Sequence, residues 1–423
     1  MSTNDYILNL LNIKDKNIFI LQNSVKQKVV KGKTYKIVEG ILTYKPKYCP
    51  VCGIVNETHN DIIKWGFRKN CKIKIPDISN CKSLLILHKQ RFLCKHCNNT
   101  FISETNLVDK NKNISNNTEL QIRLELMKKQ SEKDISLRTN VSVSKIDRVL
   151  NEVSSHTVLR HPELPKYMNW DEFKATKDTK GKMAFIIVNN ESGNIFDIRD
   201  SRKSRDLEKY FKRYSKKQRD KVKLISTDFY SGYIHLAKKL FKNADIVIDR
   251  FHIITQVYVA LQSARISLCY KSNPNYNKLK HFWKLILKNE NDLSDKKYYS
   301  NYFHKEISQK EIVTYLINTN KSLKANYECY QGIINSIRNK DFNTFKNIIY
   351  NHHDNISPKM LKVFNLYKNH IKYIENSFKY DINNGIIEGT NNLVKTVKRI
   401  AFGYRKYDHF IARIFLIKGI IKG

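Results

Sequence analysis

Residues 226–233 read Ser-Thr-Asp-Phe-Tyr-Ser-Gly-Tyr, and this stretch decides how the middle of the chain is interpreted. The apolar residues around its start predict a short strand that leads into Asp228. Far downstream, residues 385–392 read Gly-Ile-Ile-Glu-Gly-Thr-Asn-Asn and place Glu388 near the start of a predicted helix. With Asp171, which belongs to another predicted strand, these two side chains make a candidate carboxylate triad.

The elements predicted around Asp171 and Asp228 follow a recognisable order. Two further strands are predicted after Asp171, then a basic helix, the strand that leads to Asp228, a helix and a last strand at 245–248. Three strands, a helix, a strand, a helix and a strand is the order of a ribonuclease H-like fold. In that topology the strands that carry Asp171 and Asp228 are neighbours.

Three carboxylates around one point repel each other strongly, and bound divalent cations relieve that repulsion. The sequence therefore predicts Mg²⁺ or Mn²⁺ ligands at Asp171, Asp228 and Glu388. The chain also carries 77 Lys and Arg against 39 Asp and Glu, a formal charge of +38, which is typical of a protein that binds a polyanion. Together these features indicate phosphoryl chemistry on nucleic acid. Other acids compete for the same roles, namely Glu172, Asp178, Asp197, Asp200 and Asp249.

The predicted helix that begins near residue 386 has two distinct faces. At about 100° per residue, one narrow face is polar and contains Glu388, Asn392, Lys395 and Arg399. Apolar residues lie away from it, at Leu393, Val397, Ile400 and Ala401. We therefore expect this helix to bury its apolar side against the sheet while Glu388 points along a polar, basic flank.

Two Cys-x-x-Cys pairs, Cys49 with Cys52 and Cys94 with Cys97, are separated by 41 residues. Each pair can bind one side of a tetrahedral ion, so the two predict a structural Zn²⁺ site of the zinc-ribbon type, with strands in the intervening segment. Four reduced core thiols or a redox-active pair are the alternatives. Disulfides are not expected, because no secretory signal is recognised and a cytoplasmic, nucleoid-associated location is predicted.

Residues 131–153 have the pattern of a helix-turn-helix. A short helix is predicted at 131–137, a turn at 140–142, and then a helix whose buried face contains Ile146, Val149, Leu150 and Val153. The opposite face offers hydroxyl, basic and amide groups that suit contacts with DNA, at Ser144, Lys145, Arg148 and Asn151. A purely structural helical hairpin is the alternative.

The chain is expected to be multidomain α/β, and no run of apolar residues is long enough to predict a membrane span. The predicted parts are a zinc-ribbon domain at 1–104, a linker and helix-turn-helix DNA-binding domain at 105–160, the first part of a ribonuclease H-like catalytic core at 161–265, a helical stretch at 266–380, and the final helix that carries Glu388 at 381–423.

These motifs resemble the insertion-sequence transposases of the ISL-three family over nearly the whole chain. The resemblance is carried by the two cysteine pairs with the Thr-Phe that follows them and by residues 170–173, 228–233, 244–252, 387–392 and 398–405. It implies a DDE catalytic domain formed by Asp171, Asp228 and Glu388 and interrupted by an all-helical insertion. It also implies that His252 lies near the scissile phosphate, with Asp249 and Asn392 as supporting groups.

The predicted function is therefore DNA transposition. The zinc ribbon and the helix-turn-helix would recognise terminal inverted repeats, and the triad would free a 3′-hydroxyl and direct it onto target DNA. Lys395, Arg399 and Arg405 would neutralise phosphates near the cut. No nucleotide cofactor is expected, and a homodimer on DNA is expected by analogy. The alternatives are a DNA-binding regulator or decayed transposase without catalysis, and a nuclease that cleaves without strand transfer.

Overall fold

The computed structural model describes residues 3–30, 32–57, 60–155, 159, 161–179, 181–381 and 385–421. Contacts divide the chain into two compact units, Met1–Val158 with Lys395–Gly423, and Leu159–Val394. The predicted end of the helix-turn-helix region, at residue 160, lies outside the described residues. Each unit is described by itself below.

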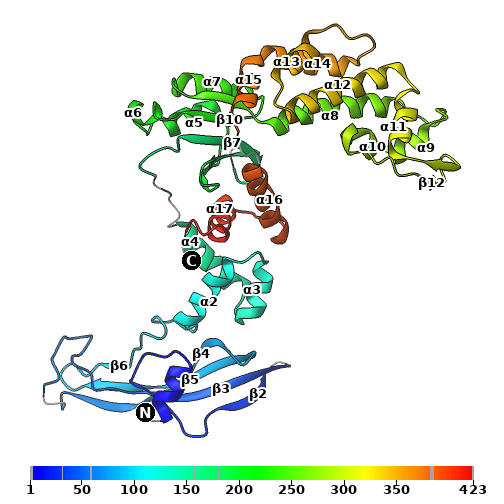
Figure 1. Ribbon diagram of the computed structural model, residues 1–423. Coiled ribbons are helices and arrows are strands. Elements are labelled where there is room, and N and C mark those ends of the chain that lie inside the picture. The colour runs from blue at the N-terminus through cyan, green and yellow to red at the C-terminus, as the bar shows by residue number, and fades with distance from the viewer. Residues whose placement is uncertain are drawn as a thin grey trace. The chain divides into compact units, whose positions relative to one another are not determined.

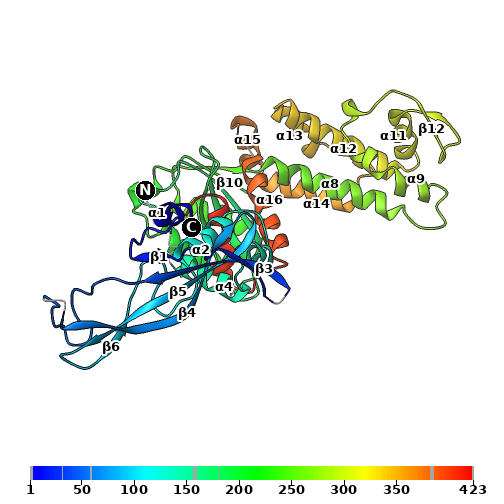
Figure 2. The same ribbon diagram turned by 90° about the horizontal axis from the view of Figure 1, so that it is seen from below.

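The first unit begins with a mixed sheet in which β5 is central (Figures 1 and 2). Its strand order is β1-β3-β5-β4, with β2 paired to β3 and β6 paired to β5. One face of the sheet is closed by apolar side chains that include Val38, Leu85 and Leu87. The elements are α1 (Thr3–Leu10), β1 (Ile18–Ile20), β2 (Lys26–Val30), β3 (Lys33–Leu42), β4 (Ile62–Ile78), β5 (Cys81–Cys94) and β6 (Thr100–Ile102).

Three helices follow the sheet: α2 (Asn116–Leu126), α3 (Glu132–Thr139) and α4 (Val143–Ser155). Ser131 and Asp134 form a reciprocal capping box at the start of α3. Asn140 ends α3 in the left-handed conformation, with φ 53°, and so turns the chain into α4. The predicted helices on either side of the turn and the predicted buried face of α4 are confirmed, whereas the assignment as a DNA-binding helix-turn-helix stays a prediction.

A fourth helix, α17 (Tyr407–Ile417), packs with α2, α3 and α4 although it is more than 250 positions downstream. Ala412 and Leu416 join the same apolar cluster as the buried face of α4. Arg413 is fully buried and donates to the carbonyl oxygens of Lys128 and Gln130, at 3.2 and 2.7 Å. Sequence analysis grouped residues 381–423 together, whereas the structure places α17 with the predicted DNA-binding helices.

The second unit is built on a five-stranded sheet of order β11-β10-β7-β8-β9. β7, β8 and β9 are antiparallel neighbours, while β10 is parallel to both β7 and β11. The predicted adjacency of the strands that carry Asp171 and Asp228 is therefore confirmed. The elements are β7 (Tyr167–Lys174), β8 (Met183–Asn189), β9 (Ile195–Arg199), α5 (Ser204–Phe211), α6 (Lys216–Arg219), β10 (Leu224–Thr227), α7 (Ser231–Leu240) and β11 (Asp245–Ile248).

One continuous apolar core joins this sheet to the helices that follow it. Trp170 lies at its centre on β7 and stacks on Phe211 of α5, with ring centroids 5.1 Å apart. Helices α8 and α12 run side by side in the helical part of the unit (Figures 1 and 2). The helices are α8 (Arg250–Ser267), α9 (Tyr276–His281), α10 (Trp283–Leu287), α11 (Gln309–Ile317), α12 (Lys321–Arg338), α13 (Phe342–Tyr350), α14 (Pro358–Asn369) and α15 (Ile371–Lys379).

The prediction that this insertion is all-helical is wrong. It contains an antiparallel pair of short strands, β12 (Tyr298–Ser300) and β13 (Lys305–Ile307), and a short 3₁₀ helix at Glu290–Asp292. The strands are only three residues long, which is too short to produce a clear alternating pattern in the sequence.

Helix α15 returns to the sheet and covers the edge of β11. Asn376 and Ser377 donate to the carbonyl oxygens of Ile246 and Ile248, at 2.9 and 2.5 Å. Arg250, at the start of α8, donates to the carbonyl oxygen of Ser377. The first and last helices of this helical part, α8 and α15, are thus held together beside β11. Helix α16 (Gly385–Ile400) follows α15 in the chain.

We predict that Leu416→Ala destabilises the helices of the first unit by about 2–5 kcal/mol, because it opens a cavity in the cluster shared by α2, α4 and α17. Denaturant unfolding and limited proteolysis within α2–α4 would measure the effect. Leu361→Ala is the matched control, since Leu361 is 49% exposed. Equal stability of the two variants would contradict the placement of α17.

Candidate functional site

The candidate active site begins where β7 and β10 run parallel. Ser226 is the last residue of β10 that pairs with β7, opposite Asn169, and Asp228 follows just past the end of β10. Neighbouring strands lie about 4.8 Å apart, which brings the carboxylates of Asp171 and Asp228 into one local electrostatic environment. The sequence produces this geometry because an apolar strand ends at Thr227 and a helix begins at Ser231.

Burial raises the pKa of two carboxyl groups in this site, Asp228 and Asp249. Desolvation raises the pKa of Asp228, and the carboxylates of Glu172 and Asp171 raise it further, while the backbone N–H of Tyr230 and the nearby His252 oppose the shift. The pKa of Asp249 is also raised by desolvation and by Asp171, against the backbone N–H of Phe251 and His252. Asp171 and His252 therefore each interact electrostatically with both Asp228 and Asp249.

Asp249 and His252 lie beside Asp171 in a small cavity of about 10 Å³, which is also lined by Thr227 and Ile387. Asp249 is 8% exposed and caps α8 by accepting from the backbone N–H of Phe251 at 2.8 Å. Sequence analysis expected Asp249 and His252 to support the carboxylates; both line this cavity with Asp171, and their role stays a prediction.

Glu388 lies in the first turn of α16 and is exposed. Three residues further along this helix, Asn391 donates a hydrogen bond from its amide to Asp171 Oδ2 at 2.6 Å. Residues three apart share one side of a helix, so this bond turns the side of α16 that carries Glu388 toward the β7 carboxylate. Sequence analysis named Asn392 instead, which is exposed on the same turn.

The predicted division of α16 into two faces is confirmed over most of the helix. Glu388, Asn392, Lys395 and Arg399 are all exposed, Leu393 and Val397 are buried, and Ile400 and Ala401 are only partly buried. Arg405 is exposed as well, in the segment before α17.

The donor chemistry fits a hard divalent cation. Asp171, Asp228 and Asp249 offer carboxylate oxygens, Asp171 interacts electrostatically with each of the other two, and the buried hydroxyl of Thr227 has no hydrogen-bond partner among the described residues. Uncompensated carboxylates in a desolvated site are unfavourable, and a cation would offset their repulsion. The arrangement therefore suits Mg²⁺ or Mn²⁺.

Sequence reasoning missed a second polar cluster beside the carboxylates. Arg202 donates to both oxygens of Glu172, at 2.7 and 2.8 Å, and the hydroxyl of Tyr233 donates to the same carboxylate at 3.0 Å. Glu172 is thus neutralised by a bidentate ion pair, which distinguishes it from its neighbour Asp171. Successive side chains of a strand point to opposite faces of the sheet, so Asp171 and Glu172 lie on different faces. Only this alternation could have suggested from the sequence that the two acids have different surroundings.

The four cysteines come together as predicted. The sulfur atoms of Cys49, Cys52, Cys94 and Cys97 all lie within 4.8 Å of one another. Cys49 Sγ is 3.8 Å from Cys97 Sγ, and Cys52 Sγ is 3.8 Å from Cys94 Sγ. A tetrahedron with metal–sulfur bonds of about 2.3 Å has edges of about 3.8 Å, so the cluster has the size of a zinc site. The backbone N–H of Asn99 also lowers the pKa of Cys97 to about 6.

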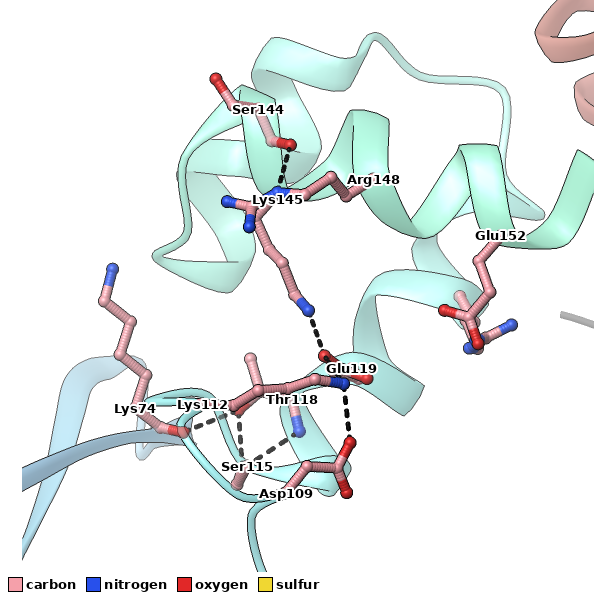
Figure 3. A network of polar contacts seen from close by, with 11 residues as sticks. Lys74, Asp109, Lys112, Ser115, Thr118, Glu119, Ser144, Lys145, Arg148 and Glu152 are labelled. Carbon is pink, nitrogen blue, oxygen red and sulfur yellow. Dashed lines mark hydrogen bonds and ion pairs between the residues drawn. The ribbon is translucent and has the colours of Figure 1, made fainter.

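The four predicted DNA-contacting residues of α4 fall into two groups. Ser144 and Arg148 are exposed. Lys145 instead forms an ion pair with Glu119 of α2, in which both side chains are more than four-fifths buried. Figure 3 shows Lys145 pointing to Glu119, with Lys112 3.8 Å from the same carboxylate.

Asn151 is held by the segment that contains α17. Its side-chain oxygen accepts from His409 Nε2 at 2.7 Å and from Lys406 Nζ at 3.1 Å. The other ring nitrogen of His409 lies 3.3 Å from Asp147 of α4. Lys145 and Asn151 therefore brace α4, whereas Ser144 and Arg148 are the members of the predicted set that face solvent.

Comparison with known proteins identifies the group. The family model of the ISL-three (ISL3) DDE transposases, described as "Transposase", matches residues 169–414, which is more than half of the chain. The chain belongs to this family of transposases. It is also similar to a protein of Lactococcus lactis subsp. lactis named "ATP-dependent protease", at 26% identity over 133 residues. That alignment spans 30% of this chain and 42% of the relative.

In the part of the chain that the structure describes, no helix has the length and apolar character needed to span a membrane.

We predict that Asp228→Asn raises the melting temperature by a few degrees at pH 7 in buffer without divalent cations. The folded-state pKa of Asp228 is raised by burial, so its contribution to stability falls as pH rises from the unfolded to the folded pKa. The gain should shrink as pH approaches about 3.9, where the parent carboxyl is also protonated. Asp245→Asn, at the opposite end of the adjacent strand, is the control, and a lower melting temperature for Asp228→Asn would contradict the expectation.

We also predict that the purified chain holds about one Zn²⁺, measured by elemental analysis. Cys52→Ser should lose the metal and lower the melting temperature, as chelation of the parent should, because metal binding stabilises the fold that presents the ligands. Cys52 is exposed, so its replacement leaves the apolar core intact. Cys81→Ser, outside the cluster, should retain the metal; if Cys52→Ser retains it too, the four-thiolate site is wrong.

Proposed function

We propose that this transposase binds the terminal inverted repeats of an insertion sequence, hydrolyses phosphodiester bonds to free 3′-hydroxyl ends, and joins those ends to target DNA. The proposal is supported by the electrostatic interaction of Asp228 with Asp171 within the family-matched region and by the hydrogen bond from Asn391, on the helix that carries Glu388, to Asp171. The strand order β9-β8-β7-β10-β11, with β10 and β11 parallel to β7, supports a ribonuclease H-like core.

In this proposal Asp171, Asp228 and Glu388 hold Mg²⁺ or Mn²⁺. A cation bound there supplies Lewis-acid stabilisation of charge on the reacting oxygens. His252 offsets the negative charge of Asp228 and Asp249, and Asp249 interacts with Asp171. In this proposal His252 also lies near the scissile phosphate. Lys395, Arg399 and Arg405 are exposed and neutralise DNA phosphates. The chemistry needs no nucleotide cofactor and no covalent bond between protein and DNA.

Recognition of DNA falls to the first unit in this proposal. The cysteine cluster is a zinc ribbon, and α3–α4 form the helix-turn-helix. Ser144 and Arg148 contact DNA, whereas Lys145 and Asn151 act by positioning α4, because both have partners within the protein. Two ends of the element have to be joined in one reaction, so a homodimer on DNA is the expected assembly.

We predict that Asp228→Asn abolishes cleavage of a duplex that contains the inverted repeat, by at least about 10³-fold with Mg²⁺ or Mn²⁺, while binding to that duplex persists. Removal of one metal-binding carboxylate eliminates charge stabilisation without touching the first unit. Gel analysis of cleaved strands and a binding titration would measure the two effects.

Asp245→Asn is the control and should cleave like the parent. If Asp228→Asn cleaves as well as the parent, the catalytic assignment is wrong. If the parent binds its ends but neither cleaves nor joins them, the chain is a DNA-binding regulator or a decayed transposase. Cleavage without joining would identify a nuclease.

A further inference from the structure

A seven-residue stretch of β4, residues 64–70, is exposed at every position. A regular strand alternates its side chains between two faces, so one in two would be expected to face the core. Two register shifts against β5 break the alternation, between Lys64 and Phe67 and between Arg68 and Cys71. Gly66 and Asn70 adopt left-handed conformations there, with φ of 72° and 60°. The bulges therefore turn consecutive side chains of this stretch to solvent.

The bulged backbone is held in place by β5. The buried side chain of Gln90 donates to the carbonyl oxygen of Gly66 at 2.7 Å. The N–H of Asn70 donates to His88 Nδ1 at 3.4 Å. The exposed stretch is thus part of an ordered edge strand of the sheet, and its N-terminal end reaches the cysteine cluster through the pairing of Ile62 with Cys94.

The composition of residues 64–70 favours binding to a polyanion that also presents accessible apolar surface. Residues 64–70 contain three cations, Lys64, Arg68 and Lys69, and no acid. Trp65 is 53% exposed and Phe67 is 41% exposed. Among the described residues no carboxylate forms an ion pair with any of the three cations.

The cross-strand pairing adds to this argument. Arg68 lies directly opposite Lys89 of β5, and like charges in that position destabilise a sheet. An anionic partner would remove the repulsion. β4 is also an edge strand, and edge strands are commonly protected from aggregation by lysines and bulges. Edge protection explains the charges, but it does not explain two exposed aromatic rings in the same stretch.

We propose that residues 64–70 of β4, at the edge of the sheet, form a second DNA-binding surface that lies against the element-end duplex. Lys64, Arg68 and Lys69 contact phosphates, and Trp65 and Phe67 contact sugars and base edges. This inference rests on the proposed function and identifies residues of the first unit, outside α4, that bind the same DNA.

The test compares two charge variants of the full chain in binding titrations at several salt concentrations. In Lys64→Gln/Arg68→Gln/Lys69→Gln, affinity for the inverted-repeat duplex should fall at least about tenfold, and the slope of log affinity against log salt should flatten by up to about 3. The matched control, Lys26→Gln/Lys28→Gln/Lys33→Gln, removes the same charge from exposed positions on β2 and β3. It should retain the parent slope.

Two further measurements separate DNA contact from edge protection. Trp65→Ala/Phe67→Ala should keep the salt slope but lose about tenfold in preference for the inverted repeat over scrambled duplex. In the unaltered chain, the duplex should protect residues 64–70 from hydroxyl-radical oxidation. Suppose that the parent binds and cleaves its ends, that residues 64–70 are not protected, and that the triple charge variant and the Trp65→Ala/Phe67→Ala variant bind like the parent. That result would overturn the inference about residues 64–70 alone. A parent that binds no end duplex would overturn the proposed function as well.

Discussion

The parallel pairing of β7 with β10 is the constraint on which the candidate site depends. β10 is buried at every position and β7 buries Met168, Asn169 and Trp170, so a slip of one residue would move the Asp171 carboxylate to the other face of the sheet. The fixed register keeps Asp171 beside the end of β10, which Asp228 follows. Their proximity is therefore maintained by packing around Trp170 and its aromatic neighbours, in spite of the electrostatic cost of placing two acids together.

Much of this arrangement could be predicted because it follows from short-range patterns. The apolar strand before Asp228, the two faces of α16 and the buried face of α4 each extend over a few turns or a few strand residues. The spacing within each cysteine pair likewise predicted the observed cluster. Within each strand, helix and cysteine pair the residues that determine the feature are close in sequence, so local periodicity or spacing is sufficient.

Other features depend on contacts between distant segments. The partners of Lys145 and Asn151, which are Glu119 and His409, cannot be identified from the pattern of α4 alone. Asn391 rather than Asn392 contacts Asp171 because of how α16 is rotated on the sheet, and the two positions differ by only about 100° around the helix. The bulges of β4 were also missed, since a strand prediction assumes uninterrupted alternation.

The position of α17 has a consequence for biosynthesis. Helices α2–α4 leave the ribosome early, yet the apolar cluster between them stays incomplete until residues 407–417 have been added. From the end of α4 to the start of α17, translation at 5–20 residues per second takes about 13–50 s. During this interval the nascent chain exposes part of a core, so it is a natural client for chaperones. Helices α2–α4 become fully packed only after residues 407–417 have been made.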